Sequence, residues 1–152
     1  MDGEVDRFLE SFDVLVQAIR RARGAQTPTH VNGRGLTLSQ YGLLQPLTNG
    51  DRARVSELSS DAGIAPSTAS RILDVLERRE VITRERHAGD RRGVEVSLTA
   101  SGRELLAGED EWLRGRQREF YARLPEHERA LAPDLFKRLA ALIDELAAGP
   151  SE

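Results

Sequence analysis

The sequence contains no cysteine, almost no lysine and no long run of apolar residues. Without cysteine the chain cannot form disulfides, zinc–thiolate sites or a thiol-based redox switch. A membrane-spanning helix needs about 18 consecutive apolar residues, and no apolar run in the sequence approaches that length. The acidic, amphipathic N-terminus is also unlike a signal peptide. We therefore expect a cytoplasmic protein with no membrane partner.

Positive charge is carried almost entirely by arginine, because Lys137 is the only lysine. The formal net charge is −3, so binding to a polyanion would depend on local clusters of arginine rather than on the total. A GC-rich genome is one explanation for the arginine content, but arginines can bind phosphates or guanine edges whatever their origin. For polyanion binding, the positions of the arginines along the chain therefore matter more than the net charge.

Helical periodicity is strong at both ends of the chain, where apolar residues recur at three- and four-residue steps. These stripes lie between residues 5 and 19, 105 and 120, and 131 and 146. Pro133 falls inside the last stripe, and it predicts a break followed by a continuous helix to about Ala148. The apolar faces could be buried within one chain or against a second copy.

The middle of the chain changes from helical to alternating periodicity. The predicted elements are helices after Thr37 or Ser39, from about Val55 to Ala62 and from Pro66, and strands over 81–86 and 94–98. Gly63 separates two of the helices, a polar loop separates the strands, and Thr99 is predicted to cap the next helix. The predicted fold class is mostly α with a small β-hairpin (α+β).

Two short helices joined across Gly63 indicate a helix-turn-helix. A recognition helix must bury one side and leave the other free to enter a major groove about 12 Å wide. The residues predicted to contact DNA from this helix are Pro66, Ser67, Thr68, Ser70 and Arg71. The alternative is an ordinary helix start followed by a solvated arginine.

The hairpin adds a second cluster of arginines directly after that helix. Its candidate DNA-binding residues are Arg84, Arg86, Asp90, Arg91 and Arg92. Arg91 or Arg92 could enter the minor groove, where narrow A·T segments concentrate negative potential. Asp90 would repel phosphate, but a contact with Arg92 would fix the direction of the guanidinium. The alternative for the tip is a solvated turn.

These motifs together resemble the MarR family of winged-helix regulators. The run from Ile64 to Arg79 resembles the family's recognition helix, and Asp90-Arg91-Arg92 followed by residues 94–102 resembles its wing and the entry to the next helix. The resemblance implies a winged helix-turn-helix domain over residues 36–103. It also implies a helical dimerisation region from both termini, formed by residues 1–24 and 104–152.

The resemblance further implies a homodimer that binds a pseudo-palindromic operator, usually as a repressor that a small molecule releases. Relatives usually have glycine where this chain has Glu80. A left-handed conformation there would cost a non-glycine residue about 1 kcal/mol, so the turn is either strained or reshaped.

An effector pocket is expected between the dimerisation region and the winged domain. Its candidate lining residues are Phe12, Val16, Ile19, Tyr41, Leu44, Trp112 and Arg116. Arg116 interrupts an apolar stripe, and its guanidinium could bind an anionic or aromatic effector or pair with an acid such as Glu119. The alternative for the apolar residues is ordinary core packing.

The sequence gives no indication of an enzyme, a cofactor or a metal. It has no Ser/His/Asp or Cys/His arrangement and no phosphate-binding glycine loop, and its three histidines are scattered. We therefore predict a regulator of transcription that binds double-stranded DNA. The alternative function is a winged-helix module used for protein–protein interaction.

Overall fold

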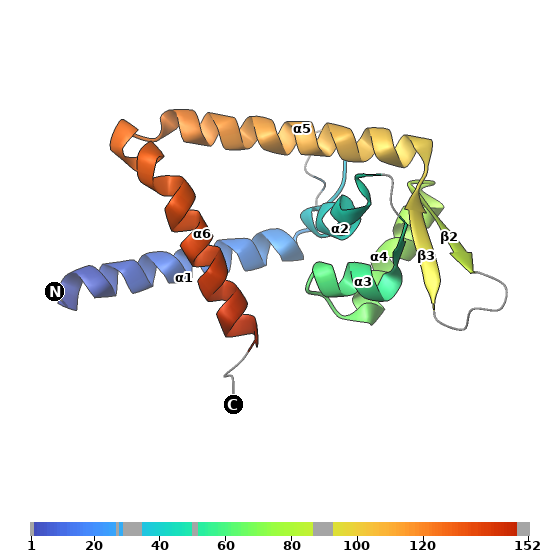
Figure 1. Ribbon diagram of the computed structural model, residues 1–152, viewed down its shortest axis with the longest axis horizontal. Coiled ribbons are helices and arrows are strands. Elements are labelled where there is room, and N and C mark those ends of the chain that lie inside the picture. Colours follow the sequence, from blue (N-terminus) through green and yellow to red (C-terminus); the bar gives the residue numbers. More distant parts are fainter. Residues whose placement is uncertain (1, 27, 29–34, 50–51, 87–92, 149–152) are drawn as a thin grey trace. The chain divides into compact units, whose positions relative to one another are not determined.

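The structure is a computed structural model that describes residues 2–26, 28, 35–49, 52–86 and 93–148. It forms two compact units, Met1–Glu111 and Trp112–Glu152. In chain order (Figure 1) the elements are α1 (Asp2–Gly24), α2 (Leu38–Leu44), the 3₁₀ turn η1 (Gln45–Leu47), β1 (Ala53–Arg54), α3 (Val55–Asp61), α4 (Pro66–Arg78), β2 (Ile82–Arg86), β3 (Val94–Leu98), α5 (Ala100–Arg123) and α6 (Glu126–Ala148). This confirms the expected α+β fold class.

Local sequence explains where α2 begins. The Thr37 hydroxyl accepts a hydrogen bond from the Gln40 backbone N–H at 3.2 Å, and the Gln40 side chain accepts one from the Thr37 N–H at 3.0 Å. This reciprocal pair is a capping box, which satisfies two donors that a helix start leaves unpaired. Of the two predicted starting residues, Thr37 is therefore the one that caps the helix.

The sheet has three antiparallel strands in the order β1-β3-β2. The hairpin pairs Ile82 with Leu98 and Arg84 with Val96. Strand β1 pairs Ala53 with Val96 on the other edge of β3. The hairpin was predicted, but β1 was not, because two residues are too short to show an alternating pattern.

A single hydrophobic core lies within the first unit. Its buried residues come from the segment before α2, from α2 to α4, from the hairpin and from the start of α5: Leu36, Leu43, Leu44, Leu47, Leu58, Ala69, Leu73, Leu76, Val81, Ile82, Val96, Leu98 and Leu106. The core therefore supports the helix-turn-helix and the hairpin together. Helix α6, by contrast, has no buried residue.

The expected helix break at Pro133 is wrong, because α6 runs without interruption from Glu126 to Ala148. Proline removes one backbone donor and crowds one turn. Good helix formers such as alanine, leucine and glutamate fill both flanking segments, so the remaining hydrogen bonds keep the helix continuous.

None of the described helices combines the length and the apolar composition that crossing a membrane requires.

Candidate nucleic-acid interface

The turn between α3 and α4 is built around one glycine. Gly63 has φ 62°, and its N–H donates to the Ser60 carbonyl at 3.0 Å. The next N–H, from Ile64, donates to the Ser59 carbonyl at 3.0 Å. A left-handed residue that ends a helix in this way favours glycine, because it has no Cβ to clash. The predicted helix-turn-helix is therefore present.

Helix α4 buries one side and exposes the other. Ala69, Leu73 and Leu76 are buried in the core, which holds the opposite face outward. Ser67 and Arg71 are exposed on that outer face. Of the other predicted DNA-contacting residues, Pro66 is exposed and Thr68 and Ser70 are half-buried. All five residues thus lie on the described part of one helix, at its N-terminal half.

The hairpin tip, with Asp90, Arg91 and Arg92, lies outside the described residues. Arg86, near the tip end of β2, is exposed. Arg84 is different, because the strand register places it opposite Val96, which is completely buried. Arg84 therefore occupies the side of the hairpin that packs on the core, and its side chain is only 20% exposed.

The guanidinium of Arg84 joins the hairpin to the recognition helix. Its Nη2 donates a hydrogen bond to Asp74 Oδ1. Its Nε lies 3.3 Å from Glu77 Oε2, an ion-pair contact that lacks hydrogen-bond geometry. Because both acids are on α4, Arg84 connects the two elements that are proposed to meet DNA. The Asp74 side chain stays half-exposed while it makes this contact.

Arg84→Gln should lower the free energy of unfolding by about 1 kcal/mol, since both carboxylates are half-exposed and lose a charge-assisted partner. The change can be measured as a shift in the denaturant midpoint. Arg86→Gln removes the same charge two residues further along β2 and should change stability by less than about 0.5 kcal/mol. Equal shifts in the two variants would show that Arg84 has no special role in positioning.

Residues 80, 81, 99, 101 and 102 form what we call the α4–β2–α5 joint. The Glu80 carbonyl accepts hydrogen bonds from the hydroxyls of Thr99 at 2.6 Å and Ser101 at 3.0 Å. The Thr99 backbone N–H donates to the Val81 carbonyl at 3.0 Å. The Thr99 hydroxyl accepts from the Gly102 N–H at 2.9 Å, which confirms the predicted cap of α5. The joint connects the recognition helix, the hairpin and α5.

Glu80 adopts φ 58°, so the turn keeps the left-handed conformation that glycine usually provides. Of the two expectations for this departure, mild strain is therefore the one observed. The two hydroxyls on the Glu80 carbonyl hold this conformation in place.

Comparison with known proteins supports one family. The sequence profile of the MarR family matches residues 36–94, the segment that contains most of the core. A transcriptional regulatory protein assigned to the hcr operon of Thauera aromatica is 30% identical over 105 residues, which are 69% of this chain and 63% of that protein. The chain belongs to the MarR family of winged-helix regulators.

Two further similarities extend over almost the whole MarR-family chain. The transcriptional repressor YetL of Bacillus subtilis is 25% identical over 151 residues, covering 93% of this chain and 86% of that protein. The crystal structure of FabT from Streptococcus pneumoniae in complex with DNA covers 96% of this chain and 99% of that chain, with 20% identity and a TM-score of 0.68. At this identity the structure supports the fold alone.

The residues expected to line an effector pocket have diverse environments. Leu44 is completely buried in the core, while Phe12 and Val16 are half-buried and Ile19 is exposed on α1. The Tyr41 hydroxyl donates to Asp110 Oδ1 at 2.9 Å. Trp112 and Arg116 belong to the second compact unit, where Arg116 pairs with Glu119 at 2.6 Å. Glu119 is the acidic partner that the sequence offered as the alternative to an effector.

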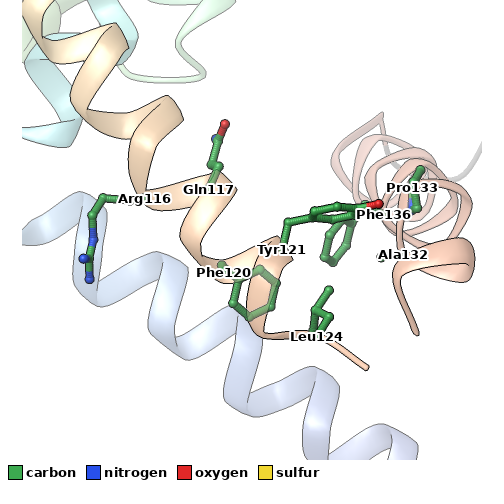
Figure 2. A pocket seen from close by; sticks show the side chains of 8 residues that line it. All are labelled: Arg116, Gln117, Phe120, Tyr121, Leu124, Ala132, Pro133 and Phe136. Atoms are coloured by element: carbon green, nitrogen blue, oxygen red, sulfur yellow. The ribbon is translucent and has the colours of Figure 1, made fainter. Parts of the chain in front are cut away.

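The second unit contains a cavity of about 510 Å³ between the end of α5 and α6 (Figure 2). Its walls are mostly apolar and aromatic: Arg116, Gln117, Phe120, Tyr121, Leu124, Ala132, Pro133 and Phe136. Arg116 is the only member of the expected effector set among them. Sequence reasoning missed the others, because the turn between α5 and α6 brings together two apolar stripes, over residues 105–120 and 131–146, that were assigned to dimerisation. Among the described residues, no cluster of potential metal ligands occurs.

Proposed function

We propose that this MarR-family protein is a sequence-specific transcriptional repressor that binds double-stranded DNA. The observation that carries the proposal is the outer face of α4, where Ser67 and Arg71 are exposed while the opposite face is fixed in the core. Among the described residues, the Arg71 guanidinium is exposed and has no acidic partner. It is therefore free to bind a guanine edge or a phosphate.

The names of the similar proteins support regulation rather than catalysis. The Thauera protein is named as a regulator of an operon, YetL as a repressor, and FabT was solved with DNA bound. The wing would add minor-groove or backbone contacts through Arg91 and Arg92, with Asp90 orienting Arg92. Arg86 would contribute positive charge at the base of the tip.

We propose that the protein acts as a homodimer on a pseudo-palindromic operator. One helix-turn-helix reads few bases, whereas two copies about 34 Å apart read two half-sites. The terminal helices expose large apolar side chains, which soluble proteins usually cover with a partner. On α1 and α6 these are Val5, Phe8, Leu9, Val14, Leu15, Ile19, Leu131, Leu135, Phe136, Leu142, Ile143 and Leu146.

We also propose that a small aromatic or anionic effector releases the DNA. The cavity in the second unit has a suitable aromatic lining of Phe120, Tyr121 and Phe136, and Arg116 adds one positive charge at its margin, with its side chain directed away from these rings (Figure 2). An anionic effector would have to compete with Glu119 for Arg116. Screening aromatic acids by thermal shift would identify such a ligand.

The DNA-binding proposal is tested by selecting bound fragments from genomic DNA and measuring affinity for the selected duplex. Arg71→Ala should lower specific binding by about 1–3 kcal/mol, because a bidentate base contact is lost, and it should relax sequence preference. Arg92→Ala should lower affinity for all duplexes. Fluorescence anisotropy with selected and scrambled duplexes measures both effects.

Unchanged binding by both variants would contradict the assigned interface. Absence of any salt-dependent DNA binding by the unmodified protein would instead favour a winged-helix module for protein–protein contact.

A further inference from the structure

A cleft of about 410 Å³ runs beside the recognition helix, between the end of α1, the start of α2 and one side of α4. Arg23 lies on its α1 side, Ser39 on its α2 side, and Thr68 and Arg71 on its α4 side. The described residues that line the cleft include two arginines and no acidic residue. In a chain of net charge −3, such a cleft is locally positive and complementary to an anion.

The backbone of Arg23 is held in place beside α4. The Ser39 hydroxyl donates a 2.7 Å hydrogen bond to the Arg23 carbonyl, which ties the last turn of α1 to α2. The Arg23 side chain is exposed. Among the described residues it has no acidic partner, whereas Arg52, Arg84 and Arg116 are each paired with a carboxylate. An arginine with an anchored backbone and an unneutralised guanidinium thus lines the cleft.

We propose that Arg23 binds a DNA phosphate at the edge of the major groove that α4 enters. This inference rests on the proposed function and extends its interface to α1. A helix with side chains is about 10–12 Å across, which fills a groove about 12 Å wide. Residues that flank the helix therefore face the sugar–phosphate walls rather than base edges. Arg23 flanks α4 across the cleft, and the hydroxyls of Ser39 and Thr68 add donors of the type that commonly bind phosphate.

The predicted signature is a change in salt dependence without a change in sequence preference. Each phosphate contact contributes roughly 0.9 to the slope of log affinity against log salt concentration. Arg23→Gln should therefore reduce the slope by about 0.9 per bound subunit on a random-sequence duplex. Its affinities for selected and scrambled duplexes should fall by the same factor. Arg23→Lys keeps the charge and should retain most of the slope.

The experiment is fluorescence anisotropy of the full-length protein with a labelled random-sequence duplex over a series of salt concentrations. Arg7→Gln is the matched control, because it removes the same charge from α1 about 24 Å away along the helix. An unchanged slope for Arg23→Gln, or an equal change for Arg7→Gln, would overturn the proposal. A changed sequence preference in Arg23→Gln would overturn it as well.

The proposed function and this inference fail in different ways. If Arg71→Ala lowers specific binding while Arg23→Gln leaves the slope unchanged, only the phosphate contact of Arg23 is refuted. If neither variant changes binding, the interface on α4 is refuted with it. If the slope is unchanged but Arg23→Gln abolishes binding of benzoate to the free protein, the cleft takes a small anion and the DNA contact is overturned.

Discussion

Replacing Gly102 with alanine is expected to lower the free energy of unfolding by about 3 kcal/mol, the upper end for overpacking a tight site. A Cβ atom on Gly102 would lie 1.9 Å from the Val81 carbonyl oxygen and 2.9 Å from its carbon. That carbonyl cannot move away freely, because it accepts the Thr99 N–H at 3.0 Å. Alanine would therefore force apart the α4–β2–α5 joint.

Gly108→Ala is the matched control for this prediction. It makes the same change in the same helix, but beyond the adjacent residues and the helix's own backbone the added Cβ meets no described atom within 4 Å. Alanine there should raise the free energy of unfolding by about 1 kcal/mol, because glycine is a poor helix former. Denaturant unfolding at one fixed protein concentration measures both changes. The same sign in both variants would mean that helix propensity, rather than the close approach to Val81, decides the outcome at position 102.

Leu135→Glu is expected to convert the proposed dimer to monomers at micromolar concentration and to weaken operator binding by at least about 100-fold. Leu135 is 49% exposed on the apolar stripe of α6, so in a homodimer each copy would place a charge in the interface. Burying an unpaired carboxylate costs several kcal/mol, and about 2.7 kcal/mol corresponds to 100-fold in affinity. The loss of operator affinity is larger still, because a monomer binds only one of the two half-sites that the dimer binds together.

Sedimentation velocity and duplex binding measured on the same samples test this prediction. Ala141→Glu adds one charge to an exposed position of α6 that lies roughly on the opposite side of the helix from the stripe centre. It should leave both the oligomeric state and the affinity unchanged. A Leu135→Glu protein that sediments like the unmodified protein would show that this stripe does not hold two copies together.

The helix-turn-helix and hairpin could be predicted from sequence because their signals are local. Gly63 ends one helix, Pro66 begins the next, and alternation marks both strands, so no long-range information was needed. The failure at Pro133 has the opposite cause. Proline is a strong local signal, but the good helix formers around it outweigh one missing hydrogen bond.

The partners of Arg84 show why part of the candidate interface could not be predicted. An arginine after a recognition helix looks like a DNA contact when only charge is considered. The strand alternation places it on the same side as Ile82, and pairing with Val96 turns it toward α4, where Asp74 and Glu77 meet it. The period-two pattern carried this signal, but the two acids come from an element whose packing angle no sequence pattern specifies.

The hydrogen bonds on the Glu80 and Val81 carbonyls have a consequence for protein engineering. Exchanging only residues 66–78 between regulators, as a way to transfer operator preference, would join the donated helix to a turn at Glu80 that the recipient's own Thr99 and Ser101 hydroxyls hold. A chimera should therefore carry everything from the capping box at Thr37 through Gly102 as one cassette. A crossover placed inside α5 after Gly102 keeps the hydrogen bonds on the Glu80 and Val81 carbonyls together within the cassette.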